Sequence, residues 1–151
     1  MKVAIVGSRD FENLKAVRGF VRSLRPGTIV LTGGAAGVDL AAETAAREEG
    51  LELEIIRPDY RKHHPKLAPK IRNREIAEKC DAMIAFWDGM SGGTANAVTW
   101  AIYFGKVVTV LTNASVPDRI DPKDAAIDSE DQQAIDQEHE DFEAGGEGGA
   151  E

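Results

Sequence analysis

The stretch that decides the fold is TIVLTGGAAGVDLA, residues 28–41. It begins with apolar and β-branched residues, which are typical of a buried strand, and continues into a loop of glycines and alanines. An alanine-rich pattern from Val38 to Glu49 then predicts a helix, and Gly50 ends it at a natural C-cap position. A strand, a glycine-rich loop and a helix in this order indicate one unit of an α/β fold.

The same alternation extends to both sides of this stretch. A strand is predicted over Val3–Val6, followed by a helix whose apolar face recurs at helical spacing. The elements predicted after residue 50 are a strand at Leu51–Ile56, a helix at Ile71–Lys79, a strand at Ala82–Phe86, a helix with the apolar stripe Thr94, Ala97, Val98, Ala101 and Ile102, and a strand at Val107–Leu111. Because strand–helix–strand connections are right-handed, the pattern predicts an α/β fold, a Rossmann-like parallel sheet of about five strands with helices on both faces.

The charges divide the chain into two parts. Residues 1–113 carry 16 Lys and Arg against 13 Asp and Glu, whereas residues 114–151 carry 2 against 13. We therefore expect one domain over residues 1–113 and an acidic, disordered tail over residues 114–151, because such segments repel themselves and offer little to bury. The tail is expected to aid solubility, and the alternative is that it competes with an anionic ligand for a basic site.

Composition argues against several classes of protein. No apolar run approaches the roughly 20 residues that cross a bilayer, and the N-terminus has the pattern of a strand rather than a signal peptide. We expect a soluble, cytoplasmic protein with no membrane partner. The single Cys80 excludes an internal disulfide and a cysteine-based zinc cage. The adjacent His63 and His64 point their side chains apart, so we expect no metal site, and no cofactor is predicted.

Three loops after strands hold the candidate ligand-binding residues, because ligands of such sheets bind outside the carboxyl ends of the strands. The first loop begins at Gly7, where the backbone must turn sharply. Ser8 offers a hydroxyl and an amide to an anion, and Arg9 offers a bidentate fork for phosphate. Asp10 either caps the following helix or contacts the ligand.

The second loop exposes backbone amides through Gly33, Gly34 and Gly37. Amides at a helix N-terminus form an anion site that the helix dipole strengthens. Asp39 lies in the first helical turn, where it either stabilises the dipole or accepts a ribose hydroxyl. The loop is neither a Walker A loop nor a strict GxGxxG motif.

The third loop, Trp87–Thr94, repeats the order of strand, glycines and helix start. Trp87 either stacks on a base or covers the edge of the sheet. The basic segment Arg57–Lys79 steers an anion inward or is a solvated loop, and its Arg72 and Asn73 open a helix near the same edge. The residues expected to contact a ligand here are Arg72, Asn73, Trp87, Asp88, Ser91, Gly92, Gly93 and Thr94.

Together these motifs resemble the SLOG superfamily, in particular its small YspA-like, YpsA-related branch. Residues 7–11 match the opening "GSRDF" motif of that branch, and residues 32–41 are similar to "SGGArGaDxxA". Arg72-Asn73, Asp81, residues 85–89 and Gly93-Thr94 complete a resemblance over about residues 1–112. It implies a Rossmannoid fold that binds a nucleotide-derived small molecule. It also allows a homodimer, because relatives pair through helices beside the site.

Two more distant resemblances imply other functions. The LOG-type phosphoribohydrolases cleave the N-glycosidic bond of nucleoside monophosphates and carry the motif PGGxGTxxE. Gly93-Thr94 and Arg72 match that family. Ala97, however, stands at the position of the motif's glutamate. The Rossmann domain of DNA-processing protein A binds single-stranded DNA through a loop like residues 32–39. A DNA-binding protein needs a broad basic surface, so a net charge of +3 beside a tail of −11 argues against a nucleic-acid partner.

The leading hypothesis is therefore that this small domain binds or senses a nucleotide-derived phosphate ligand. The first alternative is a hydrolase that acts on a ribosyl N-glycosidic bond, and the second is single-stranded nucleic acid binding. No residue is assigned a catalytic role; the candidates are Asp39, Asp88 and Arg72. An oxocarbenium-like transition state needs a nearby carboxylate, so alanine at position 97 favours binding over hydrolysis.

Overall fold

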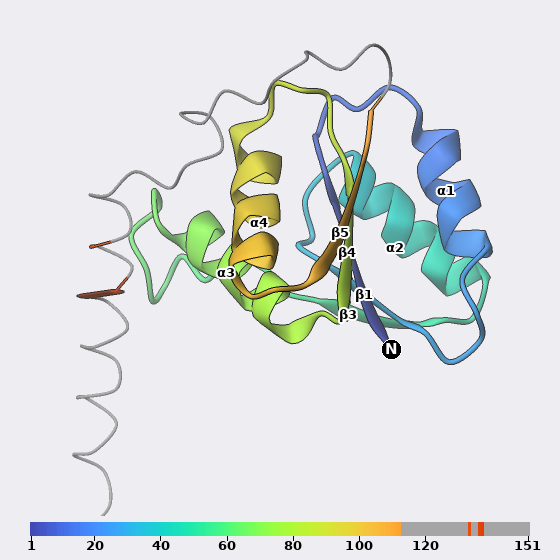
Figure 1. The fold of residues 1–151 in the computed structure, drawn as a ribbon, viewed down its shortest axis with the longest axis horizontal. Coiled ribbons are helices and arrows are strands. Elements are labelled where there is room, and N and C mark those ends of the chain that lie inside the picture. Colours follow the sequence, from blue (N-terminus) through green and yellow to red (C-terminus); the bar gives the residue numbers. More distant parts are fainter. Residues whose placement is uncertain (113–132, 134–135, 138–151) are drawn as a thin grey trace, which may run out of the picture.

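The computed structural model describes residues 1–112, 133 and 136–137. Strands and helices alternate, and all five strands of the described region form one parallel sheet in the order β3-β2-β1-β4-β5 (Figure 1). The elements are β1 (Lys2–Gly7), α1 (Leu14–Arg22), β2 (Ile29–Thr32), α2 (Val38–Glu48), β3 (Glu52–Ile55), α3 (Ala68–Lys79), β4 (Ala82–Phe86), α4 (Gly92–Tyr103) and β5 (Val107–Leu111). The predicted Rossmann-like sheet is confirmed.

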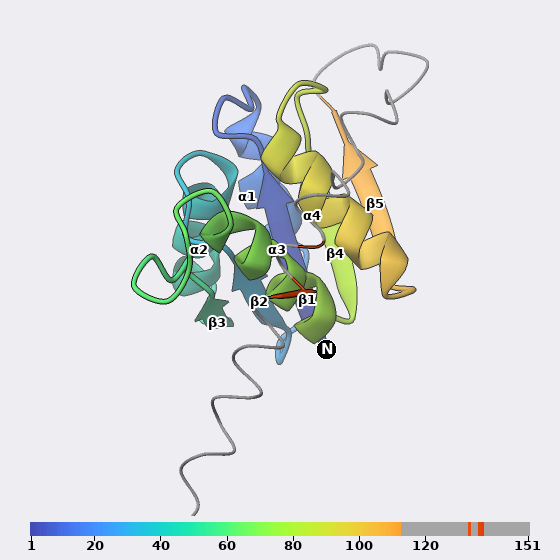
Figure 2. The ribbon, with the colours of Figure 1, turned by 90° about the vertical axis from the view of Figure 1, so that its left-hand side faces the viewer.

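Helices cover both faces of the sheet. Figure 2 shows α3 and α4 in front of the strands, while α1 and α2 lie behind them. Successive side chains of β1 point to opposite faces, so Val3 and Ile5 pack with the α1–α2 layer and Ala4 and Val6 with the α3–α4 layer. A strand that is buried on both faces is apolar throughout, which explains why β1 has no polar alternation.

The strand order places a crevice at one edge of the sheet. From β1 the chain moves outward to β2 and β3, and it then crosses to β4 and β5 on the other side of β1. The loops that follow β1 and β4 therefore diverge at their carboxyl ends. At Gly7, which ends β1, a Cβ would lie 2.5 Å from the Phe86 carbonyl oxygen and 2.6 Å from Val38 Cγ2. Only glycine lets α2 approach this closely.

The structure decides between the two roles left open for Asp10 and corrects two other local expectations. Asn13 rather than Asp10 caps α1, because its Oδ1 accepts a hydrogen bond from the Ala16 amide at 3.1 Å. Helix α3 begins at Ala68, before the predicted Ile71, because the proline in its first turn is tolerated where amides lack helical partners. Ile102 is 64% exposed, since it lies about 140° around α4 from the buried Ala97.

The predicted acidic tail, residues 114–151, lies outside the described residues except at positions 133, 136 and 137. Asp136 Oδ1 lies 3.5 Å from Arg74 Nη1 on α3, and the Asp136 side chain is half exposed. No helix in the described part of the chain is long and apolar enough to cross a membrane.

A chain that ends after Asn113 is expected to keep the domain's stability. The contact between Arg74 and Asp136 is one link that this truncation removes, and exposed ion pairs contribute little. The melting temperature, followed by circular dichroism, should fall by less than about 5 °C. A larger fall would mean that the acidic segment packs on the domain.

Candidate functional site

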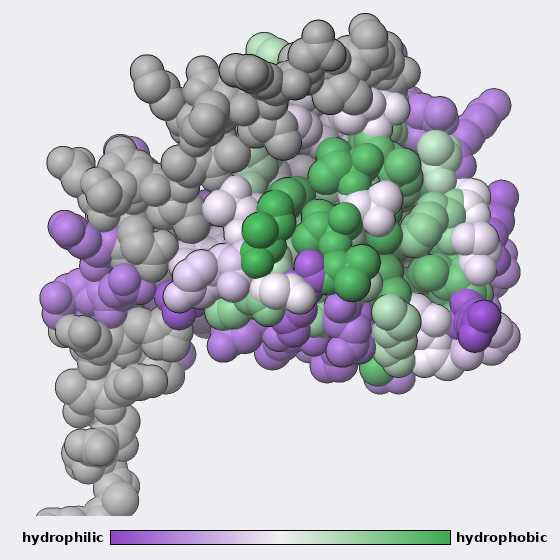
Figure 3. Space-filling model, in the orientation of Figure 1, coloured by the Kyte–Doolittle hydropathy of each residue, from purple (hydrophilic) through white to green (hydrophobic). Residues whose placement is uncertain are grey.

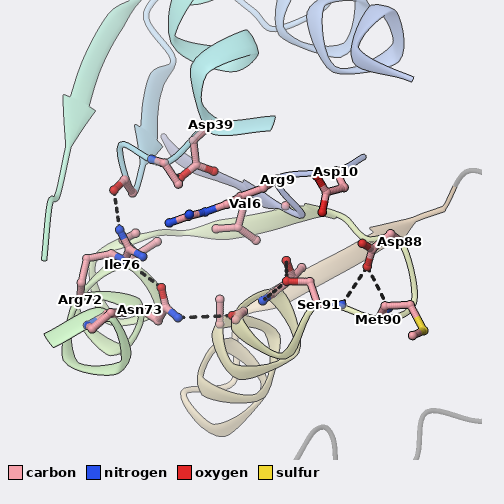
Figure 4. Close-up of a pocket in the computed structure, with 17 residues that line it drawn as sticks. Val6, Arg9, Asp10, Asp39, Arg72, Asn73, Ile76, Asp88, Met90 and Ser91 are labelled. Carbon is pink, nitrogen blue, oxygen red and sulfur yellow. Dashed lines mark hydrogen bonds between the residues drawn. The ribbon is translucent and has the colours of Figure 1, made fainter. Parts of the chain in front are cut away.

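A cavity of about 500 Å³ opens at the carboxyl ends of β1, β2 and β4 (Figure 4). Its walls are the three loops that follow these strands and the first turns of α3, which contribute Pro69, Arg72 and Asn73. This volume lies within the usual range for small-molecule sites, and the position matches the crevice that the strand order creates.

Asp39 forms one wall of the cavity from the first turn of α2. Asp39 is 5% exposed, and its Oδ2 accepts a hydrogen bond from the Ala35 amide at 3.1 Å. Burial raises the pKa of Asp39 to about 6, although the Ala35 amide and the Arg72 charge act in the opposite direction. The chain's own carboxylate therefore occupies part of the glycine loop that was expected to hold an anion.

Arg72 reaches the same wall from α3. Its Nη1 donates to the Gly33 carbonyl, and its Nε donates to Asn73 Oδ1 at 2.9 Å. Burial lowers the pKa of Arg72, Asp39 opposes this effect, and the nearby Arg9 lowers the pKa further. The guanidinium nevertheless stays charged, since an arginine loses its proton only far above neutral pH.

Arg9 extends into the cavity towards Arg72 and Asp39 (Figure 4). In the part of the chain that the structure describes, neither guanidinium forms an ion pair with a carboxylate. Arg72 instead donates to neutral carbonyl oxygens. Two neighbouring cations without an ion-pair partner make this end of the cavity attractive to an anion.

Asn73 connects α3 to the start of α4. This buried amide donates from Nδ2 to the Gly93 carbonyl at 3.3 Å and to Asn96 Oδ1 at 3.1 Å, while its Oδ1 accepts from Arg72. Its hydrogen-bonding groups are thus used within the protein. Asn73 positions Arg72 and the first turn of α4 relative to each other.

The third loop is held by Asp88, whose Oδ1 accepts from the amides of Met90 and Ser91, both at 2.8 Å. Burial would raise the pKa of Asp88, but these amides outweigh it and hold the pKa below its ordinary value. The Asp88 amide donates to Ser8 Oγ at 3.1 Å, which ties the first loop to the third.

Trp87 is buried and donates from Nε1 to the Ser91 carbonyl at 2.9 Å, so it covers the sheet edge.

The N-terminus of α4 opens into the cavity. Ser91 caps the helix, because its Oγ accepts from the Thr94 amide at 3.3 Å. Gly93 lines the cavity, and a Cβ there would meet nothing closer than Ser91 Oγ at 3.9 Å. Gly92 is exposed and lies outside the lining.

The glycines of the second loop have different roles. A Cβ on Gly33 would lie 2.8 Å from Arg72 Nη1 and 3.1 Å from Asp39 Oδ2, so this glycine leaves room for both side chains. Gly34 has a φ of +69°, and its carbonyl accepts from Arg57 Nη1 at 3.1 Å. Gly37, which has a φ of +77°, packs against the backbone of Arg9. Gly34 and Gly37 therefore shape the turn.

The structure brings most of the predicted ligand residues together. Those that line the cavity are Gly7, Arg9, Gly33, Asp39, Arg72, Asn73, Asp88, Ser91, Gly93 and Thr94. Ser8, Gly34, Gly37, Trp87 and Gly92 lie outside the lining, where they support the loops or face solvent. The lining residues that were not expected from the strand–loop pattern are Val6, Ala35, Pro69, Ile76 and Met90. Among the described residues, no group of three or more metal-ligating side chains comes together.

Comparison with known proteins supports the motifs of the first two loops. Residues 1–63 match the model of the YAcAr family, the YspA, cpYpsA-related SLOG family, so the predicted resemblance is confirmed. The match ends before α3 and the third loop. No curated protein matches the chain significantly.

Two solved structures share the fold. DNA processing protein A from Streptococcus pneumoniae has a TM-score of 0.66 and 21% identity, over 88% of this chain and 60% of that one. DNA processing protein A from Helicobacter pylori has a TM-score of 0.64 and 20% identity, over 93% of this chain and 81% of that one. The Helicobacter pylori protein has a unique single-stranded DNA binding mode. At this identity the likeness establishes the fold alone.

The pKa of Asp39 predicts a pH-dependent stability. The pKa rises from 3.8 to about 6 on folding, because the buried Asp39 side chain favours its protonated form. The contribution of the protonated carboxyl group to the free energy of unfolding is therefore complete below pH 4, and it is lost as the pH rises through about 6. This loss is up to about 3 kcal/mol. Asp39→Asn keeps an acceptor for the Ala35 amide but cannot ionise. Between pH 4 and 7.5 its free energy of unfolding in urea should rise relative to that of the wild type.

The exposed Asp10, which also lines the cavity, gives the matched control. Asp10→Asn removes a carboxyl group at an exposed position of the same cavity, so it should leave in place the pH-dependent loss of stability that Asp39 causes. Identical pH profiles for the wild type and Asp39→Asn would contradict the raised pKa of Asp39.

Proposed function

We propose that the cavity binds a nucleotide-derived phosphate ligand, and that the protein acts as a binding or sensing module for it. The observation that carries this proposal is that Arg9 and Arg72, which form no ion pair with a carboxylate in the described part of the chain, converge in the cavity into which the α4 N-terminus opens. Helix N-termini and arginine forks both favour phosphate groups.

The walls of the cavity suggest how such a ligand lies. The Gly93 amide at the start of α4 holds the phosphate, and Arg9 neutralises its charge. The second carboxylate oxygen of Asp39 accepts a sugar hydroxyl, while Val6 and Ile76 provide an apolar surface. Asp88 positions the third loop rather than the ligand, because its carboxylate already accepts two amide hydrogen bonds.

A pair of glycine substitutions tests the phosphate site. Gly93→Val places a branched side chain in the cavity at the helix start, whereas Gly92→Val places one outside it in the same turn. Isothermal titration with AMP, CMP, GMP and UMP should show binding by the wild type and Gly92→Val. For Gly93→Val the affinity should fall at least roughly tenfold, because the close approach of phosphate to the amides is blocked.

The fold of Gly93→Val is checked by its melting temperature, which should stay near that of Gly92→Val. Equal affinities of the two folded variants would contradict the proposed phosphate site. Gly34→Val is unsuitable for this test, because its positive φ and its contact with Arg57 make any side chain disruptive.

Single-stranded nucleic acid is the competing ligand that the structural neighbours suggest. The same titration therefore includes an oligothymidylate, whose binding must weaken steeply with salt if phosphate contacts dominate it. Tighter binding of the oligonucleotide than of every mononucleotide would replace the proposed small-molecule ligand with a strand.

A second candidate function, hydrolysis of the ribosyl bond, is favoured by one observation. Asp39 has a pKa of about 6, lies beside Arg72, and lines the same cavity as Ala97. A carboxyl group with this pKa suits proton transfer near neutral pH. Asp39 supplies a carboxylate at a different position in the sequence from the glutamate that the phosphoribohydrolases carry.

We still expect base release from AMP, CMP, GMP and UMP to be absent or very slow. Loss of a general acid or base costs about 100- to 10,000-fold in rate, and Ala97 offers no such group. Chromatography of the incubated nucleotides measures the release, and Ala97→Glu shows whether a carboxylate on α4 restores it. Rapid release by the wild type that Asp39→Asn abolishes would make hydrolysis the function of the site.

A further inference from the structure

One edge of the molecule carries a patch of exposed apolar side chains. In the described region nine large hydrophobic residues are exposed, and five of them lie at the end of α4 and on β5. These five, which we call the β5 patch, are Ile102, Tyr103, Val107, Val110 and Leu111. Figure 3 shows apolar surface gathered in the middle of the view in which α4 and β5 face the reader. Large contiguous apolar patches are rare on soluble monomers, and they often mark interaction sites.

The sequence of β5 is that of an internal strand. Its residues VVTVL are apolar or β-branched on both faces, a composition typical of strands covered on both sides. Within the described sheet, however, β5 pairs with β4 alone and lies at the edge. Edge strands usually carry lysine, proline or a bulge that prevents further pairing, and β5 has no lysine or proline.

The charged side chain next to the patch points into the protein. Residues 89–112 contain one charged residue, Lys106. Its Nζ donates to the carbonyls of Glu78 at 3.1 Å and Cys80 at 2.8 Å, so it closes the end of α3 rather than facing outward. The β5 patch is therefore neutral on a chain whose net charge is −8.

A neutral apolar patch fits a second copy of the same chain. Two copies bring no like charges together at this surface, although each carries a large net negative charge. A partner selected by charge would find nothing complementary here. A two-fold axis requires a surface that complements itself, and it sets two adjacent edge strands antiparallel.

We infer that the β5 patch is the interface of a homodimer, in which the β5 strands of two copies lie side by side and extend the sheet across both subunits. The burial of Val107 and Tyr103 against the partner drives association. The cavity is lined by the first turn of α4, whereas the patch begins at its last turn, so this inference does not depend on the proposed ligand.

The chain's own C-terminal residues are a poorer cover for the patch. Residues 113–151 carry 13 acidic side chains but only five large apolar ones. Placing that segment on a neutral apolar surface would desolvate carboxylates without a cation to pair with them. A monomer whose patch is covered by its own tail is one of the outcomes that the experiment distinguishes.

Sedimentation velocity of the full chain over a wide concentration range is the test. We expect the wild type to sediment as a dimer and Val107→Glu to weaken the dimer at least roughly tenfold, because it places like charges across a two-fold interface. The matched control is Leu40→Glu, which adds the same charge at a 54% exposed leucine on α2, outside the patch, and should leave the dimer intact.

A second variant keeps the test decisive if Val107→Glu fails to fold by its melting curve. Ile102→Ser changes a 64% exposed side chain on α4 and leaves β5 unaltered, and it should weaken the dimer without destabilising the subunit. A wild type that is monomeric at every concentration would overturn the inference. So would a dimer that the folded patch variants leave as stable as the control.

Discussion

The hydrogen bond from the Arg72 guanidinium to the Gly33 carbonyl joins two parts of the chain that the sheet keeps apart. Gly33 follows β2 on one side of β1, whereas α3 leads into β4 on the other side. The bond requires glycine at position 33, because a Cβ there would collide with Arg72. It also places a half-buried cation beside Asp39, whose own pKa is raised by burial. Since Arg72 is held by neutral carbonyls, its charge remains directed at the cavity, and Asn73 extends the same connection to Gly93 on α4.

Much of the fold follows from hydrophobic periodicity. The strands Ala82–Phe86 and Val107–Leu111 have the predicted bounds, because a short apolar run between glycines and helical patterns leaves little choice of where a strand begins and ends. The wrong details depend on single side chains. Whether Asp10 or Asn13 caps α1 is decided by where the loop after β1 turns, and both residues are good caps. The exposure of Ile102 depends on how far α4 and β5 are covered, which no local pattern reveals.

The candidate site was predictable to the extent that strand ends determine it. Loops after β1, β2 and β4 must meet at one edge of a parallel sheet, so Arg9, Asp39 and Gly93 could be placed together. The direction in which each loop residue points could not be predicted in this way. Gly34 faces Arg57 because its φ is positive, and Trp87 is turned into the protein by its bond to Ser91. Val6 and Ile76 enter the wall through the packing of β1 against α3, which becomes visible only in three dimensions.

Whether a phosphate-bearing nucleotide binds in this cavity can be measured by a heteronuclear NMR titration of the full chain with AMP and with ribose 5-phosphate. We expect both compounds to shift the amide resonances of Gly93, Thr94 and Arg9, and we expect AMP also to shift residues on the apolar wall near Ile76. Resonances of Arg25, on the opposite edge of the sheet, should stay in place. No shifts at saturating nucleotide, or shifts confined to residues outside the cavity, would contradict binding at this site.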